Sequence, residues 1–347
     1  MKGDGASSGP ETILLTGGAG FIGSHVAIEV ARAGMRPVLF DNLCNSKSSV
    51  VERLGSIIGH PVEFVQGDIR DGDVMRRTLR EHGVSAVIHL AGLKAVGESV
   101  QNPLEYWDNN LVGTLHMLEA MNDCGVRSLV FSSSATVYGE PQRLPVTESH
   151  RLLPASPYGQ TKLAIERMLC DLSVADTRWH ICLLRYFNPV GAHGSGLIGE
   201  DPNGIPNNLM PFVLRVASGQ FKELSVWGTD YPTPDGSGVR DFIHVCDLAE
   251  GHIAALQHLD GMRCEAINLG TGRGTSVLEL VQTFERVNGV RVPRTLRNRR
   301  DGDVAVSYAD AGKALTRLGW HTQRTVEDMC RDAWRWHNMA SARPSPD

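Results

Sequence analysis

Short apolar runs alternate with amphipathic stretches along the first half of the chain. The apolar runs end in small or acidic residues, and we interpret them as strands. They occupy residues 13–15, 37–40, 62–65, 86–90 and 128–131. Between them, apolar positions recur at helical spacing in stretches such as 22–33 and 72–82. The alternation of strand and helix predicts an α/β fold with a parallel, doubly wound sheet.

Two longer stretches, 104–124 and 158–174, carry apolar stripes at helical spacing and predict two long helices. The first stripe consists of Leu104, Trp107, Leu111, Leu115 and Leu118, and the second of Leu163, Ile165, Met168, Leu169 and Leu172. Such stripes pack against a sheet, or part of them forms the face of a homodimer. The pattern leaves both interpretations open.

The composition changes after about residue 187. Gly, Pro and Asn are frequent in 188–211, and a further loop follows at 231–238. We therefore predict a first domain over 11–187 and a smaller C-terminal α/β domain over 188–347, which would bind the substrate. Residues 1–10 are rich in Gly and Ser and lack an apolar core, so we expect a flexible leader and no signal peptide.

Composition and charge exclude several classes of function. The net charge of −5 gives no basic field for nucleic acid or for an anionic membrane. No apolar run approaches the roughly 20 residues that span a bilayer. The seven cysteines lack a C-x-x-C pair, which fits neither a disulfide framework nor a zinc site. We predict a cytoplasmic protein without a metal, whose partner is a small molecule.

A glycine-rich turn stands between the first predicted strand and helix. Gly18, Gly20 and Gly23 satisfy G-x-G-x-x-G, a turn that lets the backbone approach a pyrophosphate at a helix N-terminus. Asp41 ends the next strand, where a carboxylate accepts hydrogen bonds from the adenosine ribose and would repel a 2′-phosphate. The sequence therefore predicts a Rossmann-type domain that binds NAD in preference to NADP.

Candidate catalytic residues follow the fifth predicted strand. Ser134 closes that strand, and the spacing of four residues places Tyr158 and Lys162 on one face of the next long helix. A phenol with a pKa of about 10 is a poor base at neutral pH. We expect the Lys162 ammonium and a positive nicotinamide ring to lower the pKa of Tyr158, so that it exchanges a hydroxyl proton during hydride transfer.

Several longer strings narrow the interpretation. Together with the Gly-rich turn and Y-x-x-x-K, they resemble the UDP-glucose 4-epimerases (UDP-galactose 4-epimerases) of the extended short-chain dehydrogenase/reductase family. The strings are 41–47, 91–99, 132–139, 184–192, 204–211 and 238–245, and the similarity runs from residue 12 to residue 337.

The resemblance implies a role for each matching residue. It makes Tyr158 the base, Lys162 its pKa partner and Ser134 a hydroxyl that holds the substrate oxygen. It assigns NAD contacts to Gly17, Gly20, Phe21, Ile22, Gly23, Asp41, Asn42, Asn45, Ser46, Asp68, Ile69, Leu90, Ala91, Gly92, Lys94, Asn109, Ser132, Tyr158, Lys162 and Tyr186. It assigns UDP-sugar contacts to Lys94, Ser134, Asn188, Asn208, Leu209, Trp227, Arg240, Val277, Arg300, Asp303 and Ser307.

The implied reaction is the reversible epimerisation of UDP-glucose and UDP-galactose at carbon 4. Hydride passes to tightly bound NAD and back through a 4-keto sugar, and a homodimer built on a helix bundle is implied as well. Two positions depart from the usual pattern: Trp227 replaces a smaller aromatic residue near the uridine, and Ser307 lines the hexose pocket. A small residue at 307 implies room for an N-acetyl group, and hence activity on UDP-N-acetylglucosamine and UDP-N-acetylgalactosamine.

Four other functions compete with this interpretation. A nucleotide-sugar 4,6-dehydratase would need an Asp-Glu pair after a Thr, where this chain has Ala135-Thr136 following Ser134. A decarboxylase or net reductase matches the later strings less well, and a non-enzymatic NAD sensor usually lacks the Tyr or the Lys.

Of the arginines at 294, 297, 299 and 300, we expect most to form a solvated loop and only Arg300 to bind ligand.

Overall fold

The computed structural model describes residues 10–300 and 303–341 of the chain. Its centre is a seven-stranded sheet in the order β11-β6-β5-β4-β1-β2-β3, in which every neighbouring pair is parallel. The strands are β1 (Thr12–Thr16), β2 (Arg36–Asp41), β3 (Glu63–Gln66), β4 (Val84–His89), β5 (Ser128–Ser134), β6 (His180–Tyr186) and β11 (Cys264–Leu269). The predicted doubly wound parallel sheet is therefore confirmed.

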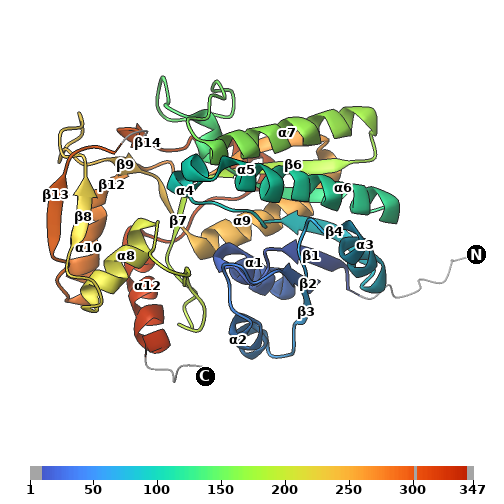
Figure 1. The fold of residues 1–347 in the computed structure, drawn as a ribbon, viewed down its shortest axis with the longest axis horizontal. Helices are drawn as coiled ribbons and strands as arrows, with labels where there is room; N and C mark the ends of the chain where they lie inside the picture. Colours follow the sequence, from blue (N-terminus) through green and yellow to red (C-terminus); the bar gives the residue numbers. More distant parts are fainter. Residues whose placement is uncertain (1–9, 301–302, 342–347) are drawn as a thin grey trace, which may run out of the picture.

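Helices cover both faces of this sheet (Figure 1). One apolar core lies under α1 (Phe21–Arg32), α2 (Ser49–Ile58), α9 (Val245–Gln257) and α11 (Gly312–Leu318). The opposite core lies under α3 (Gly72–Glu81), α6 (Gly113–Cys124) and α7 (Pro157–Ala175). Each strand is therefore covered on both sides, which explains why the strands appear in the sequence as apolar runs.

The helical stretch predicted over 104–124 is divided. It consists of α5 (Pro103–Tyr106), a π-helix η1 (Trp107–Val112) and α6, and the short helix α4 (Val96–Gln101) precedes it. Leu118 is buried, whereas Leu104 is 81% exposed and Leu115 is 42% exposed. The core-facing interpretation is therefore wrong for these two leucines. In α7, by contrast, Leu163, Ile165 and Leu169 of the predicted stripe are buried.

A smaller set of elements lies beside the main sheet, on the left in Figure 1. A separate apolar core joins α8 (Leu209–Ala217), α10 (Val277–Asn288) and α12 (Val326–Ser341) to short strands. These strands pair as β10 (Phe242–His244) with β7 (Asn188–Val190), β13 (Arg294–Arg297) with β8 (Leu224–Trp227), and β9 (Val239–Arg240) with both β12 (Thr275–Ser276) and β14 (Val306–Ser307). Two 3-10 helices, η2 (Ala135–Tyr138) and η3 (Leu259–Gly261), complete the connections.

No helix in the described part of the chain is long and apolar enough to cross a membrane. Within 10–300 and 303–341, no cluster of three or more His, Cys, Asp or Glu side chains is arranged to hold a metal ion. The predicted leader comprises residues 1–10, and all of it except Pro10 lies outside the described residues.

Candidate active site

The glycine-rich turn joins β1 to α1 at the carboxyl edge of the sheet. Gly17 has a φ of +69°, and a Cβ there would lie 2.8 Å from the backbone nitrogen of Ala91. A Cβ on Gly23 would lie 2.2 Å from the carbonyl oxygen of Gly17. Only glycine fits these positions. Gly20 is the N-cap of α1 and no side chain caps this helix, so the amides of its first turn can receive an anion.

Polar residues predicted to hold the adenosine lie together at the ends of β2 and β3. One carboxylate oxygen of Asp41 accepts hydrogen bonds from the Ser46 hydroxyl and the Leu43 amide, both at 2.8 Å. The Asn42 side chain donates to Asp68 at 3.0 Å. Asn45 lies on the same loop, where its side-chain oxygen accepts from the Asn203 amide at 3.2 Å. This loop is therefore ordered by the residues that were predicted to bind the cofactor.

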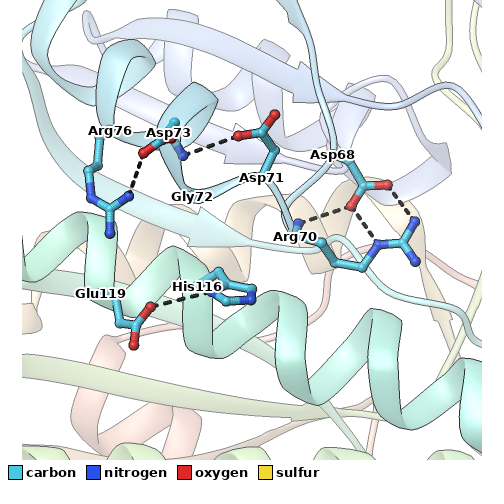
Figure 2. Close-up of a pocket in the computed structure, with 8 residues that line it drawn as sticks. All are labelled: Asp68, Arg70, Asp71, Gly72, Asp73, Arg76, His116 and Glu119. Carbon is cyan, nitrogen blue, oxygen red and sulfur yellow. Dashed lines mark hydrogen bonds and ion pairs between the residues drawn. The ribbon is translucent and has the colours of Figure 1, made fainter.

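Asp68 lies between the carboxyl edge of the sheet and an open surface depression of about 700 Å³, which it lines. Figure 2 shows the Arg70 guanidinium turned back toward the Asp68 carboxylate, with a contact of 2.8 Å. Hydrogen bonds from Arg70 hold the pKa of Asp68 well below its usual range, so this carboxylate is ionised at neutral pH. The neighbouring Ile69 side chain is buried in the core, which leaves only its backbone to face a ligand.

The start of α7 positions the two central catalytic candidates. Ser156 caps the helix by accepting a hydrogen bond from the Gly159 amide at 3.2 Å, and Pro157 is its first residue. Tyr158 and Lys162 are 7% and 4% exposed. The Lys162 ammonium donates to the Ser132 carbonyl oxygen at 2.8 Å. A Cβ added to Gly92 would lie 3.7 Å from the same ammonium, so β4, β5 and α7 meet here.

Burial opposes the phenolate form of Tyr158. Burial raises the pKa of Tyr158 to about 12, and the neighbouring Ser134 hydroxyl acts in the opposite direction. Burial also lowers the pKa of Lys162 to about 8, although the Glu166 carboxylate raises it. The predicted lowering of the Tyr158 pKa includes the charge of a bound nicotinamide ring and stays a prediction. In the chain alone, the effect of burial on this pKa outweighs that of the Ser134 hydrogen bond.

The other predicted residues of this region surround the same edge. Asn109 lies in η1 and donates to the Asn110 side chain at 2.9 Å, and Asn110 in turn holds the Leu93 amide at 2.8 Å. Tyr186 ends β6 directly opposite Ser134 of β5. Leu90 and Ala91 follow β4, where the Leu90 amide donates to the Thr16 carbonyl oxygen at 3.1 Å. Of these positions, Leu90, Ala91 and Tyr186 lie at the carboxyl ends of strands.

Four of the predicted substrate residues lie on the small strands: Asn188, Trp227, Arg240 and Ser307. Ser307 of β14 pairs with Arg240 of β9. Burial lowers the pKa of Arg240, and within the described residues no carboxylate forms an ion pair with it. Arg300 pairs with Asp303 at 3.0 Å and lies 5.9 Å from the ring centre of Trp227, which is 42% exposed. A partly buried guanidinium that forms no ion pair within the described residues is suited to an anionic ligand.

The other arginines of this region form ion pairs with carboxylates, but Arg294 and Arg297 lie on strand β13 and not in the expected solvated loop. Arg294, Arg297 and Arg299 pair with Glu285, Glu223 and Asp230. Asn188 and Val277 are placed by backbone hydrogen bonds from their amides to the carbonyl oxygens of Asp241 and Gly238.

Sequence reasoning missed a carboxylate that joins two of the predicted residues. Glu200 is 8% exposed and accepts hydrogen bonds from the Lys94 ammonium at 3.1 Å and from the Asn208 side chain at 2.5 Å. Leu209 follows as the first residue of α8. Glu200 stands in a loop rich in Gly and Pro, and its spacing from either partner carries no signal.

Two further buried residues support the catalytic candidates from behind. Glu166, one turn after Lys162 on α7, forms an ion pair with Arg185 at 2.6 Å and accepts from the Ser133 hydroxyl at 2.5 Å. The His252 ring lies 2.8 Å from the Ser132 hydroxyl. The spacing of four residues between Lys162 and Glu166 is visible in the sequence. It does not show which strands the two side chains contact.

Comparison with known proteins gives a consistent result. The chain matches the NAD dependent epimerase/dehydratase family over residues 13–270. It is 54% identical over 327 residues to a UDP-glucose 4-epimerase of Bacillus subtilis, which covers 94% of this chain and 96% of that protein.

Solved structures agree. The fold matches the Stenotrophomonas maltophila UDP-glucose-4-epimerase with bound NAD and formylated UDP-arabinopyranose at a TM-score of 0.93 and 53% identity, over 95% of this chain and 99% of that one. It also matches the UDP-Glc/GlcNAc 4-epimerase of Campylobacter jejuni at a TM-score of 0.83 and 34% identity, over 95% and 99% of the two chains.

Proposed function

The chain belongs to the NAD dependent epimerase/dehydratase family, and we propose that it interconverts UDP-glucose and UDP-galactose by inverting carbon 4 of the sugar. The observation that carries the proposal is the position of Tyr158 and Lys162 beside the glycine-rich turn, in a chain 54% identical to a UDP-glucose 4-epimerase. The enzyme would be an NAD-dependent isomerase.

The glycine-rich turn and the loop after β2 fit NAD. Gly17 and Gly23 permit the tight turn, because a Cβ at either position would meet backbone atoms, and the first turn of α1 offers amides to a pyrophosphate. Asp41 presents a carboxylate, held by Ser46 and Leu43, to the hydroxyls of a ribose. When bound, NAD would supply the hydride acceptor and donor for carbon 4.

The residues of this chain would handle the proton. Tyr158 takes the proton of the sugar 4-hydroxyl and later returns it, a role worth roughly 100- to 10,000-fold in rate. Lys162 favours the phenolate of Tyr158, together with the positive nicotinamide ring, against the cost of burial. Ser134 ends β5 next to this pair and holds the same substrate oxygen.

The diphosphate of the substrate would bind among the small strands. Arg240 is a partly buried cation without a carboxylate partner in the described part of the chain, and Arg300 lies nearby against Trp227. Guanidinium groups bind phosphates through paired, charge-assisted hydrogen bonds. Strong anchoring there leaves the hexose loosely held, so that the keto sugar can turn its opposite face to the cofactor.

We extend the proposal to the N-acetylated sugars. Ser307 pairs with Arg240 across β14 and β9 and therefore lies next to the proposed diphosphate site. A serine leaves space that a bulkier residue would fill, and its hydroxyl can hydrogen-bond an amide. The similar Campylobacter jejuni protein is named as a UDP-Glc/GlcNAc 4-epimerase. The substrates would include UDP-N-acetylglucosamine and UDP-N-acetylgalactosamine.

We also propose a cytoplasmic homodimer. The exposed apolar side chains of α4, α5, η1 and α6 support a subunit interface, since apolar side chains that gather on a surface often meet a partner. They are Val96, Val100, Leu104, Val112 and Leu115. The seven cysteines are free thiols, as is usual in a reducing compartment.

The test is incubation of the purified protein with UDP-galactose, followed by separation of the nucleotide sugars. We expect UDP-glucose to appear without added NAD, because the reaction returns the cofactor to its starting state. Tyr158→Phe should lower the rate at least about a hundredfold with the fold intact. A product that has lost water would identify a dehydratase, and unchanged turnover by Tyr158→Phe would refute the assignment of the base.

A further inference from the structure

Two cysteines far apart in the sequence lie in direct contact. Cys170 of α7 and Cys264, the first residue of β11, are separated by 94 residues, and their sulfurs are 2.6 Å apart. A formed disulfide has a sulfur–sulfur distance of roughly 2.05 Å. The fold therefore holds two free thiols close to bonding distance.

The position of this pair follows from the way α7 crosses the sheet. Lys162, Glu166 and Cys170 are spaced by four residues and therefore share one face of the helix. Lys162 contacts β5 and Glu166 contacts β6. In the sheet order β11-β6-β5, the next strand is β11, so Cys170 reaches Cys264 at the edge of the sheet.

Both thiols are half-buried and so within reach of a small reagent. Cys182, Cys246 and Cys330 are buried. The hydrogen bond from Cys264 lowers the pKa of the Cys170 thiol, and the thiolate is the form of cysteine that attacks other sulfurs. Cys170 is thus the attacking group, and Cys264 is placed to complete the reaction.

We propose that Cys170 and Cys264 are a redox modification site, which closes to a disulfide when the protein meets a small oxidised disulfide such as oxidised glutathione. The Cys170 thiolate attacks one sulfur of the reagent, a mixed disulfide forms and one reagent thiolate leaves. The Cys264 thiolate then attacks the Cys170 sulfur and the second reagent thiolate leaves. Two protein thiols are oxidised, one reagent disulfide is reduced, and the two protons end on the two reagent thiols.

The bond would join the helix that carries Tyr158 and Lys162 to the edge strand of the sheet. It would close a loop of 94 residues, which restricts the unfolded chain and so favours the folded state. Because the two sulfurs already touch, the bond needs little movement of α7. We expect the oxidised protein to unfold at a temperature several degrees higher, and a reductant to reverse this shift.

The experiment treats the folded, full-length protein with oxidised glutathione, removes the reagent, and counts free thiols after denaturation. We expect Cys170 and Cys264 to lose their free thiols, a peptide that links these two residues, and a higher thermal midpoint. Cys170→Ser and Cys264→Ser should each abolish the linked peptide and the thermal shift. Cys44→Ser, at an exposed cysteine, serves as the matched control and should retain both.

Three results would overturn the proposal. They are an unchanged thiol count at Cys170 and Cys264, stable glutathione adducts on these two residues without the linked peptide, and a linked peptide that leaves the thermal midpoint unchanged. The thiol count and the peptide map do not depend on turnover. A failure here is therefore distinguishable from a failure of the proposed epimerase activity.

Discussion

The change Glu166→Gln removes one negative charge from a network buried beneath the catalytic helix. Glu166 accepts hydrogen bonds from Arg185 at 2.9 and 2.6 Å, and another from Ser133 at 2.5 Å. The side chains of Glu166 and Arg185 are only 3% and 6% exposed. Glutamine matches the size of glutamate, but it leaves the Arg185 charge buried without a counterion.

The expected cost follows from that burial. Removing one partner of a buried ion pair costs about 3–5 kcal/mol. The entropy of unfolding of a chain of this length is roughly 0.7 kcal/mol/K, at ~2.1 cal/mol/K per residue. The loss of stability should therefore lower the thermal midpoint by about 4 to 7 °C. The matched control is Glu223→Gln, whose pair with Arg297 is 37% and 47% exposed. An exposed pair contributes about 0–1 kcal/mol, so the control should melt within about 1.5 °C of the unchanged protein.

The same change should alter the pH dependence of turnover. The Glu166 carboxylate raises the pKa of Lys162, which burial has lowered to about 8. In Glu166→Gln this pKa falls further, and a larger share of Lys162 is neutral at pH 8. The rate relative to that of the unchanged protein should therefore be lower at pH 8 than at pH 6.5. Loss of stability alone would not produce this trend.

Thermal unfolding and initial rates with UDP-galactose, measured on both variants at equal cofactor concentration, test the reasoning. Two results would refute it. If Glu166→Gln melts at the same temperature as Glu223→Gln, the buried pair does not hold α7 in place. If the ratio of rates is the same at both pH values, Glu166 does not set the charge of Lys162.

Further predictions concern substrate range, the base and acid stability. Ser307→Tyr fills the proposed hexose pocket, so N-acetylhexosamine turnover should disappear while UDP-galactose turnover persists; loss of both would contradict the pocket assignment. Lys162→Met removes the cation that favours the Tyr158 phenolate, so a pH–rate profile should show the residual rate rising at higher pH. Burial lowers the pKa of His25 and His89 from 6.5 to about 3. The unfolded chain therefore binds protons that the folded one does not, and each histidine removes roughly 2 kcal/mol of stability by pH 5. Equal thermal midpoints at neutral pH and at about pH 5 would exclude this effect.

Features set by neighbours in the sequence could be predicted. The glycine-rich turn, Y-x-x-x-K and the strand runs each depend on fewer than about ten residues, because turn geometry and helical periodicity are local. The helix predicted over 158–174 is Pro157–Ala175, since Ser156 and Pro157 also provide a local start signal. The π-helix within 104–124 was not visible, because apolar spacing alone does not distinguish it from a regular α-helix.

Features set by contacts between elements could not be predicted. Glu200 joins Lys94 to Asn208, and the first of these contacts spans 106 residues. The effect of burial on the pKa of Tyr158 was missed for a related reason. The spacing of four indicated a nearby ammonium, but the burial that raises the pKa arises from strands elsewhere in the chain. A sequence pattern shows which charges are near one another in a helix, and it does not show how far they are from water.

The position of the proposed base depends on the whole length of α7. The helix has 19 residues and so is about 28 Å long. Each successive turn after its cap contacts the next strand of the sheet: Lys162 contacts β5, Glu166 contacts β6 and Cys170 contacts β11. Since a helix is stiff, contacts at its far end restrict the tilt and rotation at its start. The contact between Cys170 and Cys264 therefore helps to orient Tyr158, although it lies at the edge strand β11.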